Sequence, residues 1–138
     1  MAETFAGFAP YRAEHEEEYM NDRQKTHFRA ILLAWKQELM EEGRRTVNSM
    51  QDEVLNLPDP NDRASQEEEF SISLRARDRE RKLLHKIDKS LGRLASDDYG
   101  YCEACGVEIG LRRLEARPTA ELCIDCKHLE EQKEKSQA

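Results

Sequence analysis

Two long stretches with helical periodicity, separated by a short break that contains two prolines, constrain the fold of this chain more than any other feature. The first stretch begins at Asp22, and its apolar residues recur mostly at steps of three and four: Phe28, Ile31, Leu32, Trp35, Leu39, Val47, Met50, Val54 and Leu57. This spacing predicts an amphipathic helix of about 35 residues, roughly 50 Å long. Proline removes a hydrogen-bond donor and disfavours helix at the preceding residue, so we expect this helix to end at Leu57-Pro-Asp-Pro60.

The second stretch follows the break and has similar spacing, with apolar residues at Phe70, Leu74, Leu84, Ile87, Leu91 and Leu94. Each helix alone would leave a hydrophobic stripe in water, and a short turn makes the two helices antiparallel neighbours. Pairing them about the turn places Trp35 near Ile87. The same register sets a polar interruption at 41–45 beside another at 75–82, which predicts a weakly packed, charge-rich middle of the hairpin.

All four cysteines lie in the last third of the chain, as Cys102-Glu-Ala-Cys105 and Cys123-Ile-Asp-Cys126. Two such turns supply the tetrahedral set of four thiolates that Zn²⁺ prefers. We therefore predict one structural zinc ion held by all four cysteines, with no position left for a reacting water. Two disulfides are the alternative, but nothing in the sequence places the chain in an oxidising compartment. A redox-active Cys-x-x-Cys pair would need a surrounding βαβ pattern, which the sequence lacks.

These features predict a mainly α fold in three parts: an acidic arm at 1–21, an antiparallel coiled-coil hairpin at 22–96 with its tip at 57–65, and a zinc-finger module with a C-terminal helix at 97–138. The arm shows no sustained periodicity, and residues 1–22 carry six acidic side chains and one basic. Such a segment is typical of a loosely held, solvated tail.

The overall charge and composition exclude several classes of function. A net charge of −7 disfavours counterion-driven duplex binding and favours docking onto another protein. No run of 18 apolar residues and no signal-peptide pattern occurs, so we expect a cytoplasmic protein with no membrane segment. The histidines show no ligand spacing and are predicted to lie at the surface: His15, His27, His85 and His128.

Several motifs resemble those of the DksA/TraR zinc-finger family, and together they cover about residues 18–133. The predicted tip and the residues after it are similar to that family's coiled-coil tip: Leu57-Pro-Asp-Pro-Asn-Asp-Arg-Ala64 and Gln66-Glu-Glu-Glu-Phe70. The other similar motifs are Arg77-Asp-Arg-Glu-Arg-Lys-Leu83, Tyr99-Gly-Tyr-Cys-Glu-Ala-Cys-Gly-Val-Glu-Ile-Gly110, Arg112-Arg-Leu-Glu-Ala-Arg-Pro-Thr119 and Leu122-Cys-Ile-Asp-Cys-Lys127.

The resemblance implies a transcription regulator, not an enzyme. Proteins of this family bind bacterial RNA polymerase at the rim of its secondary channel and insert the coiled-coil tip toward the active site. With ppGpp as co-effector they alter open-complex stability and transcription initiation in the stringent response. The resemblance therefore implies RNA polymerase and ppGpp as partners and no sequence-specific contact with DNA. We expect a monomer by default, because a hairpin that enters a pore acts singly.

The functional residues of the tip follow from the resemblance, which implies that Asp59 and Asp62 act near the active site while Arg63 and Ala64 contact the polymerase interior. The residues by themselves favour another role. Asp59 before Pro60 suits a helix N-cap, and Asp62 would lie in the first turn, where the helix dipole favours an acid. The resemblance reverses that preference, and both roles can hold because a cap can present its second oxygen to a partner.

The same resemblance implies that Arg79, Leu83, Lys86 and Lys127 form a ppGpp site shared with the polymerase rim. The first three are spaced by four and three residues, which places them on one face of a helix. Without the resemblance, this basic run would be interpreted as a solvated helix face. Several cations that converge on a tetraphosphate are chemically suited to bind it.

Three other functions remain open. A transcript-cleavage-type elongation factor would use the same channel, with Asp59 and Asp62 holding a catalytic Mg²⁺. A zinc protein that binds nucleic acid directly would show tight duplex binding with a steep dependence on salt. A thiol enzyme would need a cysteine that alkylates readily while zinc stays bound.

Overall fold

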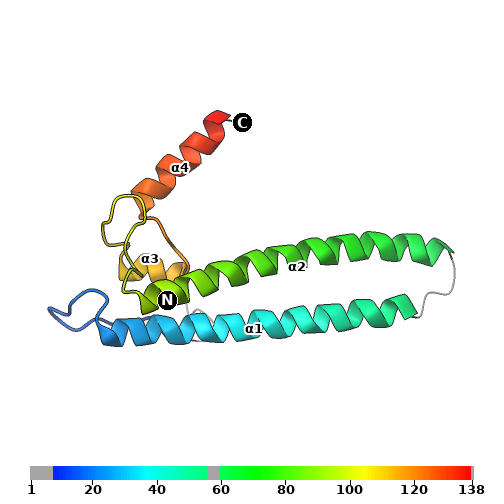
Figure 1. Cartoon of the computed structure of the whole chain (residues 1–138), viewed down its shortest axis with the longest axis horizontal. Coiled ribbons are helices and arrows are strands. Elements are labelled where there is room, and N and C mark those ends of the chain that lie inside the picture. The colour runs from blue at the N-terminus through cyan, green and yellow to red at the C-terminus, as the bar shows by residue number, and fades with distance from the viewer. Residues whose placement is uncertain (1–7, 56–59, 138) are drawn as a thin grey trace. The chain divides into compact units, whose positions relative to one another are not determined.

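The structure is a computed structural model that describes residues 8–55 and 60–137, with the side chains of all but 53–55, 60–64 and 137. Its helices are α1 (Asp22–Leu55), α2 (Pro60–Ala95), α3 (Leu111–Ala116) and α4 (Ile124–Gln137) (Figure 1). The described residues contain no strand, and Tyr101 forms an isolated antiparallel bridge with Glu108. The predicted mainly α fold is therefore confirmed. Within the described ranges, none of the helices combines the length and apolar character needed to cross a membrane.

The chain divides into two compact units that cut through both long helices. The first unit combines the chain up to Ala34 with the chain from Asp88 onward, and so contains the start of α1, the end of α2 and the cysteine-rich module. The second unit is Trp35–Ile87, the rest of the hairpin. The three-part division expected from the sequence stays a prediction, because these units follow contacts and not the order of elements.

Within the second unit, α1 and α2 run side by side in opposite directions (Figure 1). Arg77 Nη1 donates a hydrogen bond of 2.9 Å to the carbonyl oxygen of Gly43. A Cβ placed on Gly43 would lie 3.6 Å from Oε2 of Glu80. These contacts bring the two polar interruptions together in the predicted register. Met40 and Leu74, which flank these interruptions, are 44% and 57% exposed, and the loose packing of this region stays a prediction.

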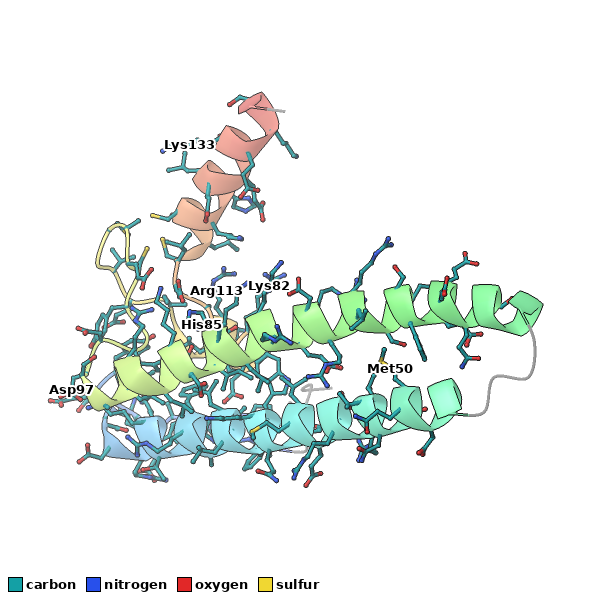
Figure 2. All side chains as sticks on the ribbon, turned by 45° about the vertical axis from the view of Figure 1, so that its right-hand side comes forward. Met50, Lys82, His85, Asp97, Arg113 and Lys133 are labelled. Atoms are coloured by element: carbon teal, nitrogen blue, oxygen red, sulfur yellow. The ribbon has the colours of Figure 1, made fainter. Side chains whose placement is uncertain are left out.

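Beyond this polar middle, Figure 2 shows Met50 pointing from α1 toward α2. Lys82 and His85 lie on the side of α2 that faces away from α1, and both are exposed. These two positions on the outer face of α2 are therefore polar, as the amphipathic pattern predicts.

The first unit contains the main hydrophobic core. Phe28, Ile31 and Leu32 of α1 are fully buried, and Leu94 of α2 is 2% exposed. From the cysteine-rich module, Tyr99 and Leu114 complete the core, and the rings of Phe28 and Tyr99 lie 5.7 Å apart between centroids. Each such side chain stabilises the fold by about 1.5–3 kcal/mol when it leaves water. The ends of the two long helices and the module therefore fold as one body.

A reciprocal pair of hydrogen bonds fixes the start of α1. Oδ1 of Asn21 accepts the backbone N–H of Gln24 at 2.9 Å, and Oε1 of Gln24 accepts the backbone N–H of Met20 at 2.6 Å. The first bond satisfies a backbone donor that the helix itself leaves without a partner, and the second fixes the residue before the cap, an arrangement similar to a capping box. The Gln24 side chain is 1% exposed, so the chain entering α1 is packed and not solvated.

The N-terminal arm, defined here as residues 8–21, is held against the rest of the first unit, so the expectation of a loosely held tail is wrong for these residues. Met20 is 6% exposed, and the backbone N–H of Tyr11 donates to Glu115 Oε1 at 2.6 Å. Glu17 accepts hydrogen bonds from the Tyr11 hydroxyl, the Asn21 amide and the Glu14 backbone, and these lower its pKa to about 2. The acidic composition suggested solvation, but aromatic and hydrogen-bonding groups dock the arm.

The prediction that all four histidines lie at the surface is wrong for His27. Its side chain is 15% exposed, and its Nε2 lies 2.6 Å from Oε1 of Glu115, which is 14% exposed. The imidazole also packs edge-on against Phe28, with ring centroids 5.0 Å apart. His27 thus belongs to the interface between α1 and α3, whereas the remaining histidines are exposed: His15, His85 and His128.

Gly92 offers a simple stabilising substitution. It lies within α2, and a Cβ added there would meet nothing within 4 Å. Gly92→Ala is expected to raise the free energy of unfolding by about 0.5–1 kcal/mol, because alanine loses less conformational entropy in a helix. Denaturant unfolding followed by circular dichroism would measure the change.

Gly100 provides the opposite case and serves as the control for Gly92. Its φ is +91°, and a Cβ there would lie 2.9 Å from Cγ of Met20. Gly100→Ala is expected to destabilise the protein by about 1–3 kcal/mol, because it adds backbone strain to a steric clash. Equal effects of the two substitutions would contradict this account of the two sites.

Candidate functional site

The four cysteines converge as the spacing predicts. Their sulfur atoms all lie within 4.8 Å of one another, and the cysteines are free, with no disulfide among them. Sγ of Cys105 lies 3.7 Å from Sγ of Cys123. Four sulfurs at about 2.3 Å from a tetrahedral zinc ion would be separated by about 3.8 Å, so this distance matches a shared metal.

The first cysteine pair lies in a short hairpin at 100–110, which we call the zinc hairpin. The backbone N–H of Cys102 donates to Val107 O at 2.8 Å, and that of Gly106 donates to Cys102 O at 2.9 Å. Gly106 has a φ of +80°, which a glycine adopts without strain. A third bond, from Ile109 N–H to Gly100 O at 2.8 Å, closes the base of the hairpin.

The second cysteine pair lies at the start of α4. The backbone N–H of Cys126 points at Sγ of Cys123 at 3.5 Å, as expected for an amide that stabilises a thiolate. Nε of Arg113 in α3, labelled in Figure 2, donates to Leu122 O at 3.1 Å and fixes the chain just before this pair. Separate sets of local hydrogen bonds therefore position the two cysteine pairs.

The electrostatics of the four sulfurs favour a divalent cation. Burial raises the pKa of the Cys102 thiol, but backbone N–H groups of Cys123, Cys105 and Ala104 outweigh it and lower the pKa to about 6. The neighbouring thiols raise the pKa of Cys126 to about 12, because sulfurs this close share their protons. A cation such as Zn²⁺ would replace those protons and relieve the repulsion between thiolates. The residues present thus fit a zinc ion.

Ion pairs join the end of α2 to both cysteine loops. Lys89 Nζ lies 3.3 Å from Oε1 of Glu103, next to Cys102, and 3.2 Å from Oε2 of Glu121, shortly before Cys123. Arg93 Nη2 donates to Tyr101 O at 2.7 Å. The individual ion pairs are partly exposed and contribute little each, but together they orient the loops on α2. Sequence reasoning missed these residues because no motif or periodicity connects the partners.

The structure describes the predicted tip residues only in part. Asp59 lies outside the described residues, and so do the side chains of Asp62, Arg63 and Ala64, although their backbone belongs to the first turns of α2. The functional and capping interpretations of the two aspartates both stay predictions.

The four residues predicted to bind ppGpp fall into both compact units. Arg79, Leu83 and Lys86 share one face of α2 in the second unit, where Arg79 and Lys86 are exposed and Leu83 is half-buried. Lys127 lies in the first turn of α4, in the first unit, and is half-buried. Their convergence on a single ligand stays a prediction.

Comparison with known proteins shows similarity along nearly the whole chain. Residues 24–94 match the family model of the DnaK suppressor protein DksA, N-terminal domain, and residues 97–132 match that of the prokaryotic dksA/traR C4-type zinc finger. The second match covers all four cysteines. The cluster is therefore the zinc site of this chain, as predicted.

Curated relatives that match this chain carry the name RNA polymerase-binding transcription factor DksA, and two of them serve as examples. The protein from Haemophilus influenzae is 62% identical over 133 residues, which cover 96% of this chain and 92% of the relative. The protein from Escherichia coli (strain K12) is also 62% identical, over 96% of this chain and 88% of the relative. A solved structure, of transcription factor DksA2 from Pseudomonas aeruginosa, matches with a TM-score of 0.80 at 43% identity, covering 87% of this chain and 94% of that one.

Proposed function

The chain belongs to the DksA family, and from this membership we propose that it is a transcription factor that binds bacterial RNA polymerase. The observation that carries the proposal is 62% identity, over 96% of the chain, to relatives named for that activity. The net charge of −7 agrees with docking onto a protein and not onto duplex DNA. A factor of this kind acts in the cytoplasm, where the polymerase lies, and needs no catalytic centre of its own.

The proposed binding mode is entry of the hairpin into the secondary channel of the polymerase. The 36 residues of α2 span about 54 Å at 1.5 Å per residue, so a hairpin of this length reaches deep into a pore. In this mode the tip would bring Asp59 and Asp62 toward the active site, with Arg63 and Ala64 against the channel interior. A single hairpin fills such a pore, which favours a monomer.

The proposed co-effector is ppGpp, bound between this chain and the channel rim. Arg79 and Lys86 are exposed, and the structure describes no ion pair that involves either side chain. Two cations on one helix face are suited to bind a phosphate group, and Lys127 would add a third from α4. Leu83 lies between the two cations on the same face and would pack beneath the ligand.

Open-complex lifetime on a stable-RNA promoter, with purified polymerase, tests the proposed function. The protein is expected to bind polymerase and shorten the lifetime, and ppGpp is expected to strengthen the effect. A protein that neither binds polymerase nor changes the lifetime would contradict the proposal. Duplex DNA without polymerase serves as the control, and tight binding to it with a steep salt dependence would instead favour direct nucleic-acid binding.

A charge-removing variant tests the ppGpp site separately. Arg79→Ala/Lys86→Ala is expected to lose most of the ppGpp-dependent part of the effect and to keep the part seen without ppGpp. Each lost charge-assisted hydrogen bond weakens ppGpp binding by about tenfold. Arg81→Ala/Lys82→Ala is the matched control, because those cations are also exposed on α2. A similar loss of ppGpp response in both variants would contradict the assignment.

A further inference from the structure

We infer that the N-terminal arm is part of the zinc-binding fold, so that docking of the arm and binding of the metal strengthen one another through Tyr19. This coupling goes beyond the proposed function, which involves the hairpin and its polymerase partner. It assigns a role to the arm, the part of the chain for which the sequence predicted none.

The Tyr19 hydroxyl closes the open end of the zinc hairpin. It donates to Gly100 O at 2.7 Å and accepts the backbone N–H of Gly110 at 3.0 Å. Gly100 and Gly110 are the two ends of the hairpin that carries Cys102 and Cys105. One side chain from the arm therefore bonds both ends of the zinc hairpin.

Close packing leaves little room between the arm and the hairpin. A Cβ on Gly100 would lie 2.9 Å from Cγ of Met20 and 3.0 Å from the Tyr19 hydroxyl. The Tyr19 ring also meets Tyr101 edge-on, with centroids 5.5 Å apart and planes at 84°. These contacts exist only when the hairpin has its folded shape, because they depend on the positions of both of its ends.

Metal binding supplies that shape. The zinc hairpin is too short to fold by burial alone, and Cys105 within it is exposed, so binding of the metal provides much of its folding free energy. If the arm bonds only to the folded hairpin, docking of the arm and binding of zinc must favour one another by the same factor. The arm then raises zinc affinity, and loss of zinc releases the arm.

Tyr19→Phe tests this coupling, because it removes the hydroxyl and keeps the ring. Competition with a chromogenic zinc chelator would measure affinity in the full-length protein. The variant is expected to bind zinc about threefold to tenfold more weakly, the effect of one lost hydrogen bond. Tyr11→Phe is the matched control, because the Tyr11 hydroxyl bonds Glu17 within the arm. Its zinc affinity is expected to equal that of the native protein.

Hydrogen exchange gives the second measurement. In the native protein, amides of residues 8–21 are expected to exchange faster once zinc has been removed, and the helices of Trp35–Ile87 are expected to keep their protection. Unchanged zinc affinity in Tyr19→Phe would overturn the inference, and so would equal weakening by Tyr11→Phe. Exchange in the arm that does not depend on zinc would overturn it as well.

Discussion

Replacing Asp59 and Asp62 by asparagine is expected to abolish most of the effect on open-complex lifetime while leaving polymerase binding nearly intact. Asparagine caps helices about as well as aspartate, so a capping role for Asp59 survives the change. Asp62 in the first turn would lose a dipole interaction of about 0.3–1 kcal/mol, too little to unfold a long helix. A functional role that depends on negative charge is lost in this variant. A change of about 1.4 kcal/mol in the barrier to open-complex decay corresponds to a roughly tenfold change in the decay rate.

The control for the tip variant is Glu68→Gln/Glu69→Gln, which removes the same charge from exposed positions on α2. It should retain the native effect on lifetime, and circular dichroism should show equal helix content in all three proteins. An unchanged lifetime effect in the tip variant would leave capping as the role of the two aspartates. Transcript cleavage in stalled complexes, lost in the same variant, would instead favour an elongation factor in which the aspartates hold Mg²⁺.

Removal of the metal is expected to have the largest effect on the fold. Cys102→Ser should reduce bound zinc from one ion per chain to near zero and unfold the module around it. Structural zinc contributes about 10–16 kcal/mol to the folding of isolated finger peptides, more than the total stability of most domains. Metal content by atomic emission and hydrogen exchange of residues 97–132 would measure both effects. The helices of Trp35–Ile87 should keep slow exchange, because none of the ligands lies among them.

His128→Ala is the control for the metal site. His128 lies two residues after Cys126 and is a zinc-ligand type, but its side chain is 68% exposed and near Glu131. The four-sulfur cluster leaves it no role, so this variant should keep one zinc ion per chain. Loss of zinc in His128→Ala would show that the histidine replaces a cysteine in the ligand set.

Sequence reasoning succeeded where the structure depends on a periodic pattern of residues or on contacts within a few residues. The apolar spacing set the two long helices, and matching their polar interruptions gave the register in which Arg77 meets Gly43. The two Cys-x-x-Cys turns likewise identified the metal and its ligands, because four soft thiolates admit few other partners. These features follow from local geometry and ligand chemistry.

It failed where one partner lies far away in the chain. The arm looked solvated because its own residues are acidic, but Tyr19 bonds to Gly100 and Tyr11 to Glu115, which lie 81 and 104 positions further on. His27 was predicted to be exposed because its partner, Glu115, is 88 positions away in the chain. No periodicity or motif in either segment carries information about such contacts.

The composition of the first unit sets the order in which the protein can form during synthesis. Its core joins Phe28, Ile31 and Leu32 to Leu94, Tyr99 and Leu114, so the first three residues leave the ribosome well before the residues that cover them. At about 5–20 residues per second, the two halves of that core emerge several seconds apart. All of Trp35–Ile87 has been synthesised before then. A chain cut short before the cysteines therefore lacks Leu114 and leaves Phe28, Ile31 and Leu32 incompletely covered, an apolar surface of the kind that chaperones recognise.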